Sequence, residues 1–120
     1  MTIAVDFDSV IREYSDKRQT GPITDPPVGG ALDGLRALMD SEAVFILTSN
    51  DVERVTRWLV DHGFVAVADM AIKRGDRFWN RKGVLLVTNW KLPARAYLDD
   101  RAVTFTSWPK ALRDLKDGGR

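Results

Sequence analysis

The chain has 120 residues, of which 44% are hydrophobic and 29% are charged, and its formal net charge is +1. This length and composition predict a single folded domain over residues 1–120 and exclude a chain that is disordered throughout. Cysteine is absent and His62 is the single histidine, which excludes disulfides, thiolate catalysis and multi-histidine zinc sites and leaves oxygen ligands, which favour Mg²⁺ or Ca²⁺.

Buried strands and amphipathic helices alternate from the start of the chain. Residues 2–6 form an apolar run ending in an acid, which predicts a strand, and residues 12–27 are polar and rich in turn-forming residues. A helix should follow, with Pro27 in its first turn and apolar residues at helical spacing: Val28, Ala31, Leu32, Leu35, Leu38 and Met39. Residues 43–48 are apolar enough for a strand covered on both faces.

The alternation continues to the end of the chain. Asn50 and Glu53 form a potential capping box for a helix that closes at Gly63. Strands are expected at 64–68, 84–88, 94–98 and 103–105, and a last helix opens at 107–109. This pattern predicts an α/β fold with a mainly parallel sheet, whose ligands bind at the carboxyl ends of the strands.

No stretch approaches the roughly 20 apolar residues of a membrane span, and the start of the chain becomes acidic too soon for a signal peptide. We therefore expect a cytoplasmic protein that makes no membrane contact. The net charge of +1 does not indicate a polyanion partner, because proteins that bind polyanions usually carry a larger excess.

Two acidic pairs follow apolar runs and so fall at predicted strand ends. Asp6 and Asp8 are two residues apart, so both can face one site while Phe7 points into the core. Asp99 and Asp100 follow another apolar run. Each pair taken alone could cap a helix or sit in a surface turn, but together they would form a carboxylate cluster that a divalent cation stabilises.

A hydroxyl and an ammonium group complete the set of candidates. Thr48 ends the strand at 43–48 and is followed by Ser49, and Lys91 precedes Asp99 by eight residues. Hydroxyl and ammonium groups can hold phosphate oxygens beside carboxylates. Taken singly, Thr48 would be a helix-entry residue and Lys91 a solvated lysine.

The order of these groups resembles that of the haloacid dehalogenase-like hydrolase superfamily, over residues 2 to about 109. The closer similarity is to small, nearly capless, phage-type phosphatases, which share Asp-Asp-Arg-Ala, here at 99–102. The resemblance implies a three-layer Rossmann-like domain with a minimal cap, for which residues 12–27 would be a flap-like insert. Two positions depart from the family pattern: Ser9 replaces a glycine, and Leu92 separates Lys91 from Pro93, which leaves Lys82 and Lys73 as alternatives to Lys91.

The resemblance also implies a magnesium-dependent phosphatase mechanism. Asp6 would attack phosphorus and form an aspartyl-phosphate, and Asp8 would act as general acid and then general base. Mg²⁺ would be held by Asp6, the backbone carbonyl of Asp8 and an acid of the Asp99-Asp100 pair. Thr48, Ser49 and Lys91 would position the phosphoryl group.

The substrate expected from the sequence is a nucleotide or a nucleic-acid end. The absence of room for a cap domain implies an open site, and the segment 73–82 combines five cations with adjacent aromatics. Arg77 could grip a phosphate backbone and Trp79 could stack on a base; alternatively, this segment is a solvated loop whose aromatics pack on the sheet.

Two other functions remain open at this point. A receiver-like phosphoacceptor domain uses similar groups but needs an aspartate where this chain has Thr48. A catalytically inactive relative could instead bind phosphate or nucleic acid, and Ser9 is the residue that favours this alternative.

Overall fold

The computed structural model describes residues 2–13, 23–69, 78–99, 103–104 and 107–116. In chain order, its elements are β1 (Thr2–Asp6), α1 (Ala31–Ser41), β2 (Ala43–Leu47), α2 (Val52–Asp61), β3 (Ala66–Ala68), β4 (Leu85–Thr88), β5 (Ala96–Asp99), β6 (Val103–Thr104) and α3 (Trp108–Lys116). Each lies within a few residues of an element predicted from the hydrophobic pattern. The α/β class is confirmed.

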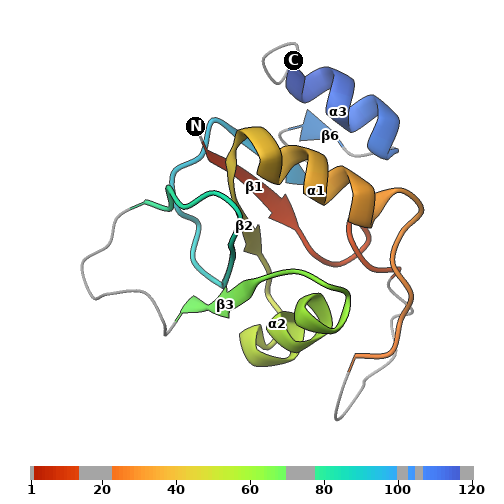
Figure 1. Ribbon diagram of the computed structural model, residues 1–120, viewed down its shortest axis with the longest axis vertical. Helices are drawn as coiled ribbons and strands as arrows, with labels where there is room; N and C mark the ends of the chain where they lie inside the picture. Colours follow the sequence, from red (N-terminus) through yellow and green to blue (C-terminus); the bar gives the residue numbers. More distant parts are fainter. Residues whose placement is uncertain (1, 14–22, 70–77, 100–102, 105–106, 117–120) are drawn as a thin grey trace.

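The strands form one sheet in the order β3-β4-β2-β1-β5-β6, and every pair is parallel. β1 is central: Asp6 is opposite Leu47 of β2, and Val5 is opposite Leu98 of β5. All strands therefore end at the same edge, which we call the carboxyl edge, and begin at the opposite amino edge (Figure 1).

The two faces of the sheet are covered differently. Residues such as Ile3 and Val5 lie in the core cluster that contains the buried residues of α1, α2 and α3, so this is the helix face. Ala4 and Phe45 point to the other face, where Trp79 and Leu92 from non-helical segments pack on them. We call this the coil face.

The predicted three-layer arrangement is not found in the described part of the chain, where the helices share one face. The crossovers from β1 to β2 and from β2 to β3 run in the same direction along the sheet. Right-handed connections then place α1 and α2 on the same face. The return crossing from β4 to β5 runs through residues 89–95, which are not helical.

The predicted starts of the first two helices need correction. α1 begins at Ala31 after Gly30, which has φ 83°, whereas Pro27 pairs with Arg12 in an antiparallel bridge. The N-cap of α2 is Asp51 instead of Asn50, because the Asp51 carboxylate accepts the backbone N–H groups of residues 53 and 54 at 2.9 and 3.2 Å. The predicted stop at Gly63 is confirmed by its φ of 92°.

α3 packs against α1 (Figure 1), and Trp108, the first residue of α3, lies at this contact. The indole is 1% exposed, and its Nε1 donates to the Val10 carbonyl at 2.9 Å. Trp108 lies so close to Gly34 of α1 that a Cβ at Gly34 would be 2.3 Å from the ring. The absence of a side chain at Gly34 therefore allows α3 to support the turn that follows Asp8.

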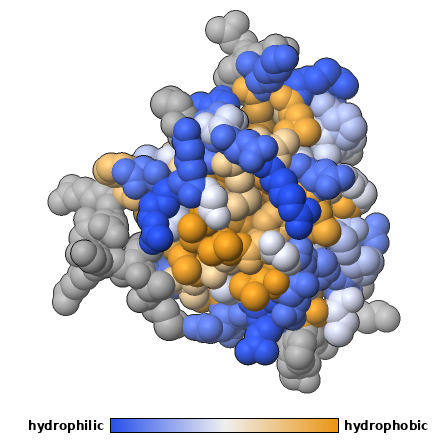
Figure 2. Space-filling model, viewed as in Figure 1, coloured by the Kyte–Doolittle hydropathy of each residue, from blue (hydrophilic) through white to orange (hydrophobic). Residues whose placement is uncertain are grey.

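Apolar residues lie near the centre of the face shown in Figure 2, with hydrophilic residues around them. Large apolar side chains that remain exposed include Val60 (50%), Val65 (61%), Phe78 (58%) and Trp90 (72%). Across the described elements, no helix combines the length and apolar character needed to cross a bilayer.

The amino edge is held by a bidentate ion pair. Arg95 precedes β5 and Glu42 precedes β2. The guanidinium of Arg95 donates to the Glu42 carboxylate, with Nη2–Oε2 at 2.5 Å, and it also donates to the Leu115 carbonyl of α3. The hydrogen bond from Arg95 lowers the pKa of Glu42 below its ordinary value, and the same bond raises the pKa of Arg95. This ion pair connects α1, β5 and α3 at the edge opposite Asp6.

Gly34→Ala should destabilise the protein by about 1–3 kcal/mol, because the added methyl overpacks against Trp108. The sign of this change in the free energy of unfolding is informative, because alanine at an ordinary helix position stabilises a protein by about 1 kcal/mol relative to glycine. Urea unfolding measures the change. Gly29→Ala is the control: its Cβ would meet nothing within 4 Å, so no destabilisation is expected, and the smaller entropy of the unfolded chain should stabilise the protein by up to about 1 kcal/mol.

Glu42→Gln should lower the free energy of unfolding at pH 7 by about 1 kcal/mol, the scale of a partly exposed ion pair. A carboxyl whose folded pKa is depressed stabilises the fold above its unfolded pKa and loses this effect as pH falls through the folded pKa. The difference between the native protein and the variant should therefore shrink below about pH 4.5. A difference that stays constant from pH 7 to pH 3 would contradict this prediction.

Candidate active site

Asp6 ends β1 and is followed by a tight turn. The Phe7 carbonyl accepts the N–H groups of Ile11 and Arg12 at 2.9 and 3.1 Å. Phe7 is fully buried and packs edge-on against Trp58, whereas Asp6 and Asp8 are partly exposed. This confirms the predicted alternation, and the Phe7 N–H donates to Asp6 Oδ1 at 2.9 Å.

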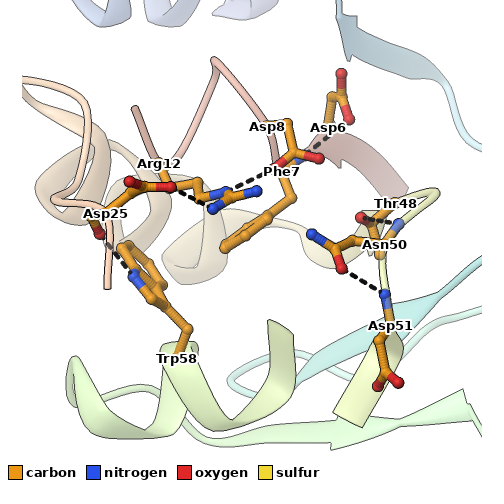
Figure 3. A network of polar contacts seen from close by, with 9 residues as sticks. All are labelled: Asp6, Phe7, Asp8, Arg12, Asp25, Thr48, Asn50, Asp51 and Trp58. Carbon is orange, nitrogen blue, oxygen red and sulfur yellow. Dashed lines mark hydrogen bonds and ion pairs between the residues drawn. The ribbon is translucent and has the colours of Figure 1, made fainter. Parts of the chain in front are cut away.

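Arg12 is a charged residue of the site that sequence reasoning did not single out. It is 3% exposed, and its guanidinium donates from Nε to Asp8 Oδ1 at 2.6 Å and from Nη1 to Asp25 Oδ2 at 2.5 Å (Figure 3). The Asp25 carbonyl in turn accepts Trp58 Nε1 at 3.0 Å. A buried cation thus orients the Asp8 carboxylate and connects it to α2. The spacing of Arg12 and Asp25 carries no periodic signal, so only the fold could reveal this contact.

The flap-like insert, expected over residues 12–27, is described at its two ends only, since residues 14–22 lie outside the described chain. The two ends run antiparallel: the Glu13 N–H donates to the Pro26 carbonyl at 2.8 Å, and the Val28 N–H donates to the Ile11 carbonyl at 2.7 Å. The stem of the insert therefore rises directly from the turn that carries Asp8.

Thr48 follows β2, one residue beyond the level of Asp6. It is 4% exposed, its N–H donates to the Thr88 carbonyl at 3.0 Å, and its Oγ1 accepts the Asn50 N–H at 3.0 Å (Figure 3). The hydroxyl can still donate its own proton to an anion. Ser49 is exposed beside it.

Asn89, a polar strand-end residue with no role in the predicted site, holds this loop from the next strand. Its Nδ2 donates to the Thr48 carbonyl at 2.5 Å and to the Asn50 carbonyl at 3.0 Å. The Thr88 hydroxyl accepts the Trp90 N–H at 3.0 Å and donates to Asp69 Oδ2 at 3.2 Å. The loops after β2 and β4 are consequently joined by side-chain hydrogen bonds.

Lys91 is exposed, and its Nζ lies 4.8 Å from the ring centre of Tyr97. Tyr97 pairs with Ala4, two residues before Asp6, so both aromatic ring and ammonium lie on the face toward which Asp6 points. Of the alternatives to Lys91, Lys82 precedes β4 and therefore lies at the amino edge, opposite the edge where Asp6 lies. Lys73 lies outside the described residues.

The predicted magnesium ligands are described in part. β5 lies beside β1, and Asp99 is its last residue, but the Asp99 side chain and the whole of Asp100 are outside what the structure describes. Within the described residues, no three histidines or acids gather as a metal site. Asp6 supplies a carboxylate and Asp8 a backbone carbonyl, which leaves the Asp8 carboxylate to Arg12 and to proton transfer, and Mg²⁺ commonly binds one or two carboxylates together with water and a substrate phosphate. The chemistry of this donor pair fits Mg²⁺.

Trp79 was predicted to stack on the substrate, and this prediction is wrong. The residue is 4% exposed in the core of the coil face, and its carbonyl accepts the Thr2 hydroxyl at 2.6 Å. Thr2 begins β1, so it lies four residue steps, about 13 Å, from Asp6. The indole packs on the sheet, as the alternative expected for this residue, whereas the neighbouring Phe78 is 58% exposed. Arg77 lies outside the described residues.

Ser9 has φ 68°, the left-handed conformation that glycine adopts most easily. Ser9→Gly should therefore stabilise the protein by about 0.5–1 kcal/mol, since relief of about 1–2 kcal/mol of strain exceeds the added chain entropy. Ser9→Val should destabilise it, because a β-branched residue is strained further at positive φ. Thermal unfolding compares the three proteins, and a less stable Ser9→Gly variant would contradict the strain argument.

Within the described residues, the carboxyl edge brings Asp6, Asp8 and Thr48 together on adjacent strands and loops. Comparisons of the chain with protein-family models, with curated proteins and with solved structures find no match. The assignment of a function therefore depends on the residues of this edge and their chemistry.

Proposed function

We propose that the protein is a magnesium-dependent phosphomonoester hydrolase with Asp6 as its nucleophile. The observation that carries the proposal is the strand order. β1 lies between β2 and β5, so the strand that ends in Asp6 has Thr48 on one side and the backbone of Asp99 on the other. Three chemically complementary positions, far apart in the sequence, meet at the edge where ligands of parallel sheets bind.

Catalysis would proceed in two displacements. A carboxylate oxygen of Asp6 attacks phosphorus, and the leaving alkoxide takes a proton from Asp8. Asp8 then removes a proton from the water that attacks the aspartyl-phosphate, which releases inorganic phosphate and restores Asp6. Each step needs Asp8 in one orientation, which the buried Arg12 supports through its bond to Oδ1.

Phosphate oxygens would be held by the loop after β2. Thr48 offers its hydroxyl proton, and the exposed Ser49 adds a second hydroxyl. Because Asn89 holds the carbonyls of this loop, the donors are ordered before substrate arrives. Lys91, exposed beyond β4, would supply a positive charge for the same anion.

Asp6, the backbone carbonyl of Asp8 and one acid of the Asp99-Asp100 pair would hold Mg²⁺. When bound, the ion offsets the charge of an anionic nucleophile and an anionic substrate and stabilises charge in the transition state.

Asp6→Asn should reduce phosphate release from a generic aryl phosphate by at least about 1000-fold, because the amide is a poor nucleophile. Its unfolding curve should remain close to that of the native protein, since the change is nearly isosteric. Asp40→Asn, at an exposed position near the end of α1, is the matched control and should keep full activity.

Removing the metal with a chelator should abolish activity, and adding Mg²⁺ should restore it. Retained turnover in Asp6→Asn, or activity that ignores the chelator, would contradict the mechanism. A native protein that binds phosphate esters but hydrolyses none in the presence of Mg²⁺ would contradict the enzymatic proposal and favour the binding-only alternative.

A further inference from the structure

We propose that Trp90 is the stacking surface for the base of a nucleotide phosphate ester bound at the carboxyl edge. This inference rests on the proposed function, since it assigns the substrate class of the same site. It concerns a residue that follows β4, on a different loop from the segment 73–82 in which the sequence suggested a stacking aromatic.

Trp90 is an exposed indole on a constrained loop. Its side chain is 72% exposed, the largest value among the exposed large apolar residues of the described chain. Its backbone N–H donates to the Thr88 hydroxyl at 3.0 Å, and the preceding Asn89 bonds to the Thr48 and Asn50 carbonyls. A large aromatic surface is thus presented to solvent from a loop already tied to the candidate phosphate-binding loop.

The position of this loop suits a nucleotide. β4 is adjacent to β2, and β2 is adjacent to β1, so the end of β4 is two strand spacings, about 10 Å, from the end of β1. A phosphate at Asp6 and a base at Trp90 would have the sugar between them. A small phosphate ester without a base would leave the indole uncovered.

Stacking on an indole would not distinguish one base from another. Stacking uses the face of a base, which every base possesses, so an exposed indole predicts broad tolerance among bases. Lys91, next in the chain, is exposed and could attract the anionic ester. The predicted class is therefore a nucleotide phosphate with little base preference, either free or at the end of a nucleic acid.

The test compares AMP with ribose 5-phosphate, which differ by the base. Trp90→Ala should lower kcat/KM for AMP by about 5- to 150-fold, the range of base–aromatic stacking. It should change kcat/KM for ribose 5-phosphate by less than about twofold, and Trp90→Phe should retain most of the AMP activity. Phe78→Ala is the matched control: this exposed aromatic precedes Trp79 near the amino edge, so both substrates should be unaffected.

A binding measurement separates failure of this inference from failure of the proposed function. AMP should quench tryptophan fluorescence of the native protein more than ribose 5-phosphate does, without any need for turnover, and Trp90→Phe should lose that difference. Hydrolysis of both esters with no effect of Trp90→Ala would overturn this inference alone. Quenching that depends on Trp90, with neither ester hydrolysed, would overturn the phosphatase proposal but support the nucleotide site.

The source of the nucleotide is decided by a third substrate, a 5′-phosphorylated deoxyhexanucleotide. A lower KM than for AMP, rising steeply with salt, would assign a nucleic-acid end. A KM equal to or above that of AMP would assign free nucleotides.

Discussion

The candidate site depends on the ion pairs that the buried guanidinium of Arg12 makes with Asp8 and Asp25. A cation that is 3% exposed must be compensated by charge and hydrogen bonds, and Asp8 and Asp25 provide both. Removing Arg12 would leave two carboxylates, Asp8 and Asp25, without the cation that pairs them, so the arrangement depends on this one side chain. Through it, the turn after β1, the stem of the insert and Trp58 of α2 are held in one relative position (Figure 3).

The two edges of the sheet are held by different kinds of contact. At the amino edge, Glu42 and Arg95 join elements that are distant in sequence, and Trp79 fills the coil face; both contribute to stability. At the carboxyl edge, Thr48 and Thr88 hold their own loops through their hydroxyls, and Asn89 joins the two loops. The loops after β2 and β4 are thus restrained by side-chain hydrogen bonds at the edge where Asp6 lies.

Much of the site could be anticipated because strand ends are readable. A buried parallel strand appears as an apolar run, so the polar residue that stops the run marks the edge of the sheet, as Asp6 and Thr48 do. The two tryptophans could not be ranked in this way. Trp79 and Trp90 both occur in polar segments. Which of them packs on the sheet depends on how each segment runs over the coil face, and the local sequence does not reveal this.

By itself, the sequence determined the α/β class, the positions of the strands and helices, and the alternation that buries Phe7 between Asp6 and Asp8. These features depend on local periodicity, which a single chain displays directly. The tertiary structure alone decided that the described helices share one face, that Arg12 reaches Asp25, and that Trp90 is the exposed indole at the carboxyl edge. These depend on strand order and on contacts between distant segments, and neither leaves a periodic signal in the sequence.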